Sequence, residues 1–320
     1  MTKSTNLVQT LPASCYTSEE FLKLAKSEIF DKGWHFVVPL SRFTKSEKEK
    51  AVQFDFLKNP FFGLCDIEDI QNCTSINLYY GHKDEILEEE DVSVALSKLE
   101  KVNSIVSESG LVFITHEKSP SQTFEQYYGN QLTQFINPID FRKMPLRRSL
   151  VYETDYNFLT FIDGYQECLH CKYTHPGLSK MYSIDFYKVE PYTNFCRHLA
   201  TPSGTLAEDT AGLFLYFFPV SSLNLYGGGL GCFRVCPISA DKCRMEFDYF
   251  FEGLDDEFEE YYHFVRQVAE EDRDLCEAVQ INLKTGKYHQ GILNPIKETG
   301  VIYYQNLIRQ RTGLIENSVM

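Results

Sequence analysis

Hydrophobic and polar positions in the first third of the chain predict one helix followed by a small β region. Thr17-Ser18-Glu19-Glu20 is typical of a helix start with Thr17 as the cap, and apolar residues then recur at helical spacing as far as Phe30. A strand is expected at 34–38, and short apolar runs broken by Asn, Pro, Gly and Asp predict further strands within 50–85. Another strand is expected at 110–115.

The rest of the chain predicts a second sheet and a long helix. A strand-like run at 152–161 precedes a short helix that is expected at 161–170. A helical period of apolar residues extends from about 256 to 283. These segments together predict an α+β fold, with an antiparallel sheet covered by the long helix. The remaining strands of this sheet are expected at 213–218, 223–226, 233–236 and 245–251.

Composition is that of an ordinary globular protein with a sizeable core. The chain has 320 residues, of which 43% are hydrophobic and 24% charged, and its length predicts about two domains. An aromatic content of 14% argues against disorder. The net charge of −14 and the lack of a Lys/Arg-rich stripe argue against a nucleic-acid partner.

The lack of a long apolar run and of a secretory signal pattern indicates a cytoplasmic location. No run of about 18 apolar residues predicts a membrane span, and the first residues lack the pattern of a secretory signal. The ten cysteines are therefore expected to be free thiols or ligands and not a disulfide framework.

The densest concentration of potential ligands lies at 167–176. His170 and His175 are five residues apart, which on a regular helix turns their side chains about 140° from each other. They converge only if the helix ends between them, and Thr174 and Pro176 favour such an ending. Two imidazoles and one carboxylate from elsewhere would form the site used for non-haem Fe(II). The alternative is that both are ordinary core or surface histidines.

The long helix offers the missing carboxylate. Asp272 stands where the apolar stripe calls for a hydrophobic residue, and a buried carboxylate needs a cation or donor opposite it. Its neighbours Glu271 and Asp274 fall off the stripe and are predicted to lie on a solvated face. The alternative is a drifting stripe that leaves Asp272 half exposed. The stripe itself consists of Val265, Val268, Ala269, Asp272, Leu275, Cys276 and Val279.

An ordered set of motifs resembles the Rieske-type non-haem iron oxygenases, and most of all their choline and carnitine monooxygenase branch. The family pattern reads roughly Asn-Trp-Lys, Glu-Asn-Tyr, Glu-Cys-Tyr-His-Cys and, four residues later, His-Pro. The likeness continues in Phe218-Pro219, 223–226, 234–237, 271–280 and 300–304, and at the N-terminus in 16–34. The corresponding central stretch here is Asn157-Phe158-Leu159, Asp163-Gly164-Tyr165, Glu167-Cys168-Leu169-His170-Cys171 and His175-Pro176.

The resemblance implies a metal site and a domain plan. His170, His175 and Asp272 would bind Fe(II), and Glu167 would stand where the family has an acid that bridges electron transfer between subunits. Residues 121–320 would form the catalytic domain, a helix-grip antiparallel sheet with a pocket between sheet and long helix. Residues 36–120 would form a smaller, degenerate Rieske-like β domain, and 1–35 an N-terminal helix packed on the catalytic domain.

The family's [2Fe–2S] ligands are missing from the sequence. Its Cys-Pro-Tyr-His-Gly-Trp corresponds to Asn77-Leu78-Tyr79-Tyr80-Gly81-His82, so Asn77 and Tyr80 replace a cysteine and a histidine. Cys65 and Cys73 lack histidine partners, and His82 and His116 remain as isolated residues that are expected to be structural or exposed. We therefore expect no own cluster. A structural zinc held by the Cys-x-His pairs at 168–170 and 196–198 is a further alternative, although the spacing matches no common zinc pattern.

Without a cluster, the chain needs another source of electrons. A ferredoxin- or Rieske-type partner could deliver the electrons near Glu167. The chain could instead work with peroxide or with another reductant. As a third option, it could be a redox-silent partner or ligand-binding subunit. Retention of Asp272 favours the first option. The family's three-fold assembly suggests a homotrimer, although a chain without a cluster has less need of one.

The branch resemblance implies a small quaternary ammonium substrate such as choline, acted on with dioxygen. Aromatic rings can bind such a cation through their faces, although core packing explains the same residues. The binding residues themselves are not identified by the sequence. The candidate aromatic residues on the expected strands are Phe214, Tyr216, Phe217, Phe233, Phe247 and Tyr249.

Overall fold

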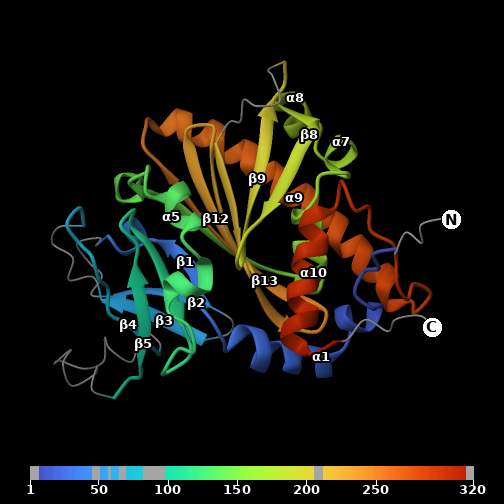
Figure 1. Cartoon of the computed structure of the whole chain (residues 1–320). Coiled ribbons are helices and arrows are strands. Elements are labelled where there is room, and N and C mark those ends of the chain that lie inside the picture. Colours follow the sequence, from blue (N-terminus) through green and yellow to red (C-terminus); the bar gives the residue numbers. More distant parts are fainter. Residues whose placement is uncertain are drawn as a thin grey trace.

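The computed structural model of this chain describes residues 7–44, 51–56, 59–64, 70–81, 98–204 and 212–314. Two antiparallel sheets form its framework, and Figure 1 shows the smaller one beside one end of the larger. The smaller sheet has the strand order β1-β6-β5-β4-β3-β2. Its strands are β1 (His35–Pro39), β2 (Ala51–Phe56), β3 (Asn59–Leu64), β4 (Leu78–Tyr80), β5 (Lys101–Val106) and β6 (Leu111–Thr115).

The larger sheet contains seven strands in the order β7-β13-β12-β11-β10-β9-β8. Neighbouring strands are mostly neighbours in sequence, joined by short turns, such as the one at Gly227 and Gly228, which both have positive φ. The strands are β7 (Leu146–Thr154), β8 (Tyr182–Pro191), β9 (Phe195–Pro202), β10 (Leu213–Phe217), β11 (Ser221–Tyr226), β12 (Gly229–Ser239) and β13 (Lys242–Phe251).

Helices cover the larger sheet and connect the two sheets. The 30-residue helix α9 crosses one face of the larger sheet, and α10 stands beside β8 (Figure 1). Among the residues described, no helix combines the length and apolar character needed to cross a membrane. The helices are η1 (Ala13–Tyr16), α1 (Glu19–Ala25), η2 (Lys26–Phe30), η3 (Leu40–Phe43), α4 (Phe124–Tyr128), α5 (Gln131–Ile136), η4 (Phe141–Lys143), α6 (Phe158–Tyr165), α7 (Cys171–Thr174), α8 (Pro176–Met181), α9 (Asp255–Lys284) and α10 (Thr299–Thr312).

The α+β fold with a long helix on an antiparallel sheet is confirmed, with local corrections. The strand expected at 152–161 is wrong beyond Thr154, because Asn157 caps α6 by accepting a hydrogen bond from the Leu159 N–H at 2.8 Å. The first helix is capped by Ser18 and not by Thr17. Strands β8 and β9 and helix α10 were not expected from the sequence.

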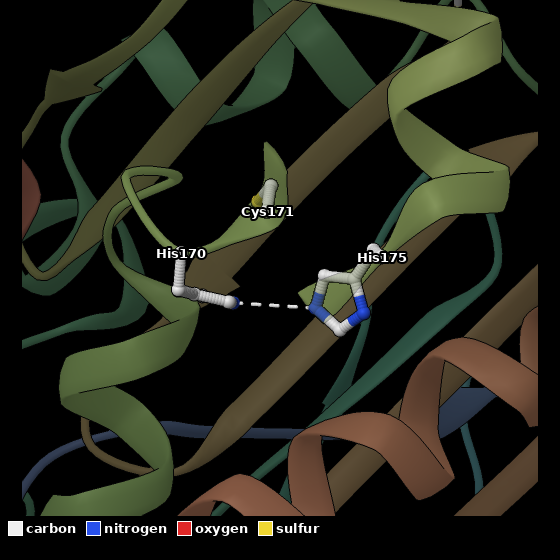
Figure 2. A group of neighbouring side chains, drawn as sticks. All are labelled: His170, Cys171 and His175. Atoms are coloured by element: carbon white, nitrogen blue, oxygen red, sulfur yellow. Dashed lines mark hydrogen bonds between the residues drawn. The ribbon is translucent and has the colours of Figure 1, made fainter. Parts of the chain in front are cut away.

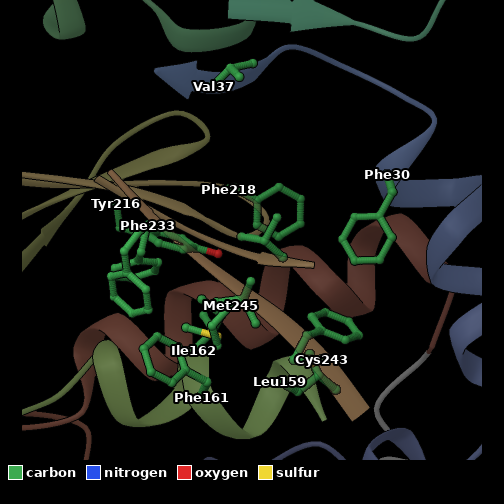
Figure 3. Packing of buried hydrophobic residues seen from close by; sticks show 14 of the residues in the cluster. Phe30, Val37, Leu159, Phe161, Ile162, Tyr216, Phe218, Phe233, Cys243 and Met245 are labelled. Carbon is green, nitrogen blue, oxygen red and sulfur yellow. The ribbon is translucent and has the colours of Figure 1, made fainter. Parts of the chain in front are cut away.

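Alternating residues of the larger sheet supply two apolar cores. Phe233 and Val235 of β12 face α6 and α9, whereas Leu230 and Cys232 face the opposite side, toward β1 and β6. Figure 3 shows the first core, where side chains of α6, the sheet strands and the N-terminal segment meet. The core on the α9 side therefore surrounds the region that carries the predicted ligands.

A buried glutamine ties α9 to the helix that leads to the histidines. Gln280 is fully buried and accepts hydrogen bonds from the Asn157 N–H and the Thr160 hydroxyl, each at 3.0 Å. Its amide group donates to the Tyr16 carbonyl at 2.9 Å. The predicted stripe member Val279 is instead 39% exposed. The stripe has therefore drifted by one residue, and its polar member fixes α6 relative to α9.

A buried arginine cluster connects the larger sheet to the smaller one. Arg234 lies between the carboxylates of Glu246 and Asp248, at 3.0 and 2.9 Å, and donates to the Val37 carbonyl of β1 at 2.9 Å. Burial alone would raise the pKa of Asp248, but Arg234 and Arg42 outweigh this effect and the pKa lies below its ordinary value. The charges are thus compensated where the two sheets meet.

The buried carboxyl group of Asp163 on α6 is expected to make the stability of the folded chain depend on pH. Desolvation raises its pKa to about 7, although the Gln305 amide and the Tyr16 hydroxyl donate to its oxygens. The folded state therefore keeps a proton that the unfolded chain releases near pH 4. Since the unfolded state then binds fewer protons, the free energy of unfolding should fall by as much as about 4 kcal/mol between pH 4 and 7.

Urea unfolding at several pH values tests this prediction. Asp163→Asn mimics the protonated side chain and should lose less stability than the wild type as the pH rises from 4 to 8. Parallel pH profiles for the two proteins would show that Asp163 is ionised in the folded state at neutral pH.

Candidate metal centre

A helix ending brings His170 and His175 together. The short helix α7 begins directly after His170 and ends at Thr174, so His175 lies outside it, as the sequence predicts. Pro176 is the first residue of α8 and disfavours helical geometry for His175, whose φ and ψ are −116° and 73°. Figure 2 shows the two imidazole rings with their nitrogens facing each other.

Asp272 of α9 completes this group. The Nε2 atoms of His170 and His175 are 3.2 Å apart. The Oδ1 atom of Asp272 lies 3.0 Å from Nε2 of His175 and 3.4 Å from Nε2 of His170. Ligand atoms that stand at right angles about 2.1 Å from one metal ion are about 3 Å apart. The three atoms therefore have the spacing of one face of a metal coordination sphere.

Each imidazole has a carboxylate behind it. Nδ1 of His170 pairs with Oε1 of Glu167, whose other oxygen accepts the Leu169 N–H. Nδ1 of His175 lies 2.8 Å from Oε2 of Glu271. Carboxylates in this position orient a metal-binding imidazole so that Nε2 faces the ion. The prediction that Glu271 lies on a solvated face is therefore wrong, whereas Asp274 is exposed as expected.

The carboxylates around the two histidines favour the protonated, positively charged form of each imidazole. Burial alone would lower the pKa of His170, but hydrogen bonds to Asp272 and Glu167 outweigh burial and raise it to about 10. The pKa of His175 is also raised, mainly by Asp272, and that of Asp272 is lowered by both imidazoles against its desolvation. Since a metal ion binds neutral imidazole, a divalent cation would replace these protons and neutralise the same carboxylates.

The two cysteines of the motif are bonded to each other. A disulfide joins Cys168 and Cys171, which corrects the expectation of free thiols or ligands for this pair. Cys171 Sγ lies within 4.8 Å of the imidazole nitrogens, but a disulfide sulfur is not a thiolate ligand. The bond also argues against the structural zinc alternative, which needs Cys168 as a thiolate. The cysteines of the described residues that form no disulfide are Cys15, Cys73, Cys196, Cys232, Cys236, Cys243 and Cys276.

A cavity of about 170 Å³ opens onto the group, between the larger sheet and α9. Four of the six candidate aromatic residues line it, whereas Tyr216 and Phe217 are packed in the cores. Tyr165 also lines the cavity, and its hydroxyl donates to Asn224 at 2.6 Å. The lining includes Phe161, Tyr165, His170, His175, Tyr182, Tyr187, His198, Phe214, Asn224, Tyr226, Phe233, Phe247, Tyr249, Tyr261 and Asp272.

The expected cluster positions lie in the smaller sheet. Asn77 is exposed, Tyr80 pairs through its hydroxyl with Nδ1 of His116, and the Cys73 thiol donates to the Ser75 carbonyl at 2.9 Å. His116 is thus held within the structure, as the sequence suggests. Cys65 and His82 lie outside the described residues.

Comparisons with known proteins show which proteins this chain resembles. Residues 191–313 match the family of ring hydroxylating alpha subunits in their catalytic domain. The carnitine monooxygenase oxygenase subunit of Acinetobacter pittii (strain PHEA-2) is 26% identical over an alignment of 227 residues that covers 63% of this chain and 60% of that protein. Residues 191–313 of the chain are therefore similar to the catalytic domain of the ring hydroxylating alpha subunits.

Two further proteins are similar to this chain. The chloroplastic choline monooxygenase of Arabidopsis thaliana is 27% identical over 154 residues, covering 44% of this chain and 36% of that protein. A solved quaternary ammonium Rieske monooxygenase, described in terms of carnitine oxidation by gut microbiota and inter-subunit electron transfer, superimposes with a TM-score of 0.77. The superposition covers 97% of both chains at 18% identity, which establishes the fold. The matches span about 60% or less of the length of these curated relatives.

Proposed function

We propose that this chain is a non-haem Fe(II) monooxygenase that acts on a small quaternary ammonium compound. The observation that carries the proposal is the convergence of His170, His175 and Asp272, with all three ligand atoms within 3.4 Å of one another. Two imidazoles and one carboxylate are the ligand set of non-haem Fe(II) oxygenases, which leave open positions on the metal. Bound Fe(II) would supply the activation of dioxygen at this face.

The chain's own residues orient the ligands and shelter the reaction. Glu167 and Glu271 hold the two imidazoles through Nδ1, which directs both Nε2 atoms toward Asp272. Gln280 fixes α9 against α6 and thereby keeps Asp272 in register with the histidines. The aromatic lining of the cavity excludes bulk water from the bound substrate.

The aromatic content of the cavity and its lack of basic side chains support a cationic substrate. No lysine or arginine is found among the described lining residues. Faces of Tyr and Phe rings attract a quaternary ammonium group by about 0.5–2 kcal/mol each. The curated relatives carry the names of carnitine and choline monooxygenases, which agrees with this class of compound. Choline is the simplest representative.

We further propose that a separate ferredoxin- or Rieske-type protein supplies the electrons. The family's cluster ligands are replaced by Asn77 and Tyr80, so residues 36–120 would be a Rieske-like domain without a cluster, and 121–320 the catalytic domain. Glu167 is 13% exposed and contacts His170, which suits an acid that relays electrons from a docked donor. The same surface would face a neighbouring subunit in a homotrimer.

A redox-silent subunit that only binds ligand or partner is the second candidate function. The replaced cluster ligands favour it, because a mononuclear oxygenase needs two electrons from outside in each turnover. It gives no reason for Asp272 and two flanking carboxylates to surround the histidines, since uncompensated carboxylates are costly when partly buried. We therefore prefer the enzymatic function.

Iron loading and oxygen consumption separate the two functions. We expect the purified chain to take up about one Fe(II) per chain under anaerobic conditions. The three ligand atoms already lie at the distances from one another that are expected for ligands of one metal ion. With choline and an iron–sulfur electron donor, it should then consume dioxygen in proportion to substrate. Metal analysis and an oxygen electrode measure both quantities, with donor-free and choline-free samples as controls.

Two results would contradict the proposal in different ways. Iron uptake without any donor-dependent oxygen consumption, for choline and carnitine alike, would favour the redox-silent function. A visible absorption band typical of a [2Fe–2S] cluster in the pure chain would show that the cluster is present after all.

A further inference from the structure

One wall of the cavity carries a polar pair with an unused hydrogen-bonding atom. Nδ1 of His198 on β9 lies 2.5 Å from the hydroxyl of Tyr187 on β8. Both residues line the cavity, and His198 is only 3% exposed. Its Nε2 atom is buried and has no hydrogen-bond partner within the part of the chain that the structure describes. An unpaired buried imidazole nitrogen costs about 1–3 kcal/mol, so a ligand atom is the expected partner.

The proton on this imidazole can be placed from its surroundings. Burial lowers the pKa of His198 to about 3, so the ring is neutral. Burial and the nearby Glu167 and Asp272 charges raise the pKa of Tyr187, which keeps its proton. If Tyr187 donates to Nδ1, one hydrogen bond satisfies both groups and Nε2 carries the N–H. In the opposite tautomer Nδ1 would donate to the Tyr187 oxygen, which would leave the Tyr187 proton without an acceptor, and Nε2 without a donor, among the described residues.

We propose that His198, held by Tyr187, donates a hydrogen bond from Nε2 to an uncharged oxygen of the substrate, a hydroxyl or a carbonyl. This inference rests on the proposed function, since it assigns the residue that orients the substrate in the cavity of that enzyme. His198 is thus a positioning and specificity residue, and no covalent bond to it forms or breaks.

One feature of the cavity favours an uncharged oxygen over a carboxylate. No lysine or arginine lines it among the described residues, so no basic side chain there could pair with a carboxylate of the substrate. A single neutral N–H does not offset the desolvation of a carboxylate in such surroundings. The substrate is therefore an ammonium alcohol and not a zwitterion with a terminal carboxylate.

The ring of Tyr165 helps to define this contact. Its centroid lies 4.9 Å from that of His198, so it restricts the imidazole from one side. Its hydroxyl already donates its proton to Asn224 at 2.6 Å and is not available as a donor to a ligand. Tyr165→Phe therefore offers a matched control, in which a hydroxyl is lost from the same cavity but the His198 nitrogen is not affected.

Calorimetric binding of two ammonium compounds to the full chain, without dioxygen, tests the inference. Choline and ethyltrimethylammonium differ only in the hydroxyl group. We expect the wild type and Tyr165→Phe to bind choline about tenfold more tightly. In His198→Leu and Tyr187→Phe this preference should fall close to one, with affinity for ethyltrimethylammonium unchanged. A preference that survives in both variants would overturn the inference.

A neutral alcohol separates this inference from the proposed function. If the wild type binds neither ammonium compound, the proposed substrate class is wrong, and 3,3-dimethylbutan-1-ol then probes His198 alone. An affinity about tenfold higher for the wild type than for His198→Leu would uphold the His198 contact. Equal affinities, or no binding of any alcohol, would overturn it. Nitrogen-15 NMR provides a further check, since a proton on Nδ1 of His198 contradicts the assignment.

Discussion

Alanine in place of Asp272 is expected to leave the purified chain with less than about a tenth of the wild-type iron. The substitution removes the only carboxylate that approaches both Nε2 atoms, at 3.0 and 3.4 Å, among the residues described. Two imidazoles alone hold a divalent ion weakly, and neither Glu167 nor Glu271 can replace the oxygen, because each is bonded to an Nδ1 atom on the outer side.

The matched control for this experiment lies two residues further along the same helix. Asp274 is 69% exposed and pairs with Arg273, so Asp274→Ala should keep both iron and stability. Metal analysis after anaerobic loading and desalting gives the iron content, and thermal unfolding shows whether each variant is folded. A folded Asp272→Ala protein with wild-type iron would remove Asp272 from the site and weaken the enzymatic function with it.

Local signals in the sequence single out each of these three residues. Pro176 predicts the helix ending that separates His170 from His175, and the structure places that ending at Thr174. Asp272 stands out because a charge interrupts an apolar stripe, and the part of the stripe at Val265, Ala269 and Cys276 faces the core. The long-range convergence itself could be expected only through the family resemblance, since no local pattern relates residue 170 to residue 272.

The residues behind the ligands were harder to predict. The periodicity of the helix alone predicts a solvated face for Glu271, because it contains no information on the separate segment that brings His175 against this residue. The same periodicity predicts a buried Val279, whereas the drift of the stripe along a 30-residue helix turns Gln280 inward. A glutamine is unremarkable in sequence, and only its three buried partners show its role.

Tertiary contacts also explain the elements that the sequence did not reveal. The register of β8 against β9 shifts between Ser183 and Lys188, which breaks the alternation by which strands are recognised. The strand expected to continue to 161 ends early because Asn157 caps a helix there, in a run of residues that suits either state. His198 and Tyr187, which belong to these unexpected strands, were consequently not identified as part of the cavity.

Glutamine in place of Glu167 is expected to reduce donor-driven oxygen consumption by about 10–100-fold while most of the iron is retained. The variant keeps an oxygen for the Leu169 N–H but presents an amide to Nδ1 of His170, so the charge behind this ligand is lost. His170, His175 and Asp272 are untouched. The loss should therefore concern electron delivery more than metal binding, and stopped-flow reduction by the iron–sulfur donor measures it directly.

Glu271→Gln is the matched control for the Glu167→Gln experiment. Glu271 stands behind His175 as Glu167 stands behind His170, and its removal changes the charge near the metal in the same way. If Glu167 relays electrons, only Glu167→Gln should slow reduction by the donor, and turnover driven by hydrogen peroxide should be similar in the two variants. Equal slowing in both would reduce Glu167 to an acid that orients its imidazole, and the docking site for the donor would then have to lie elsewhere on the chain.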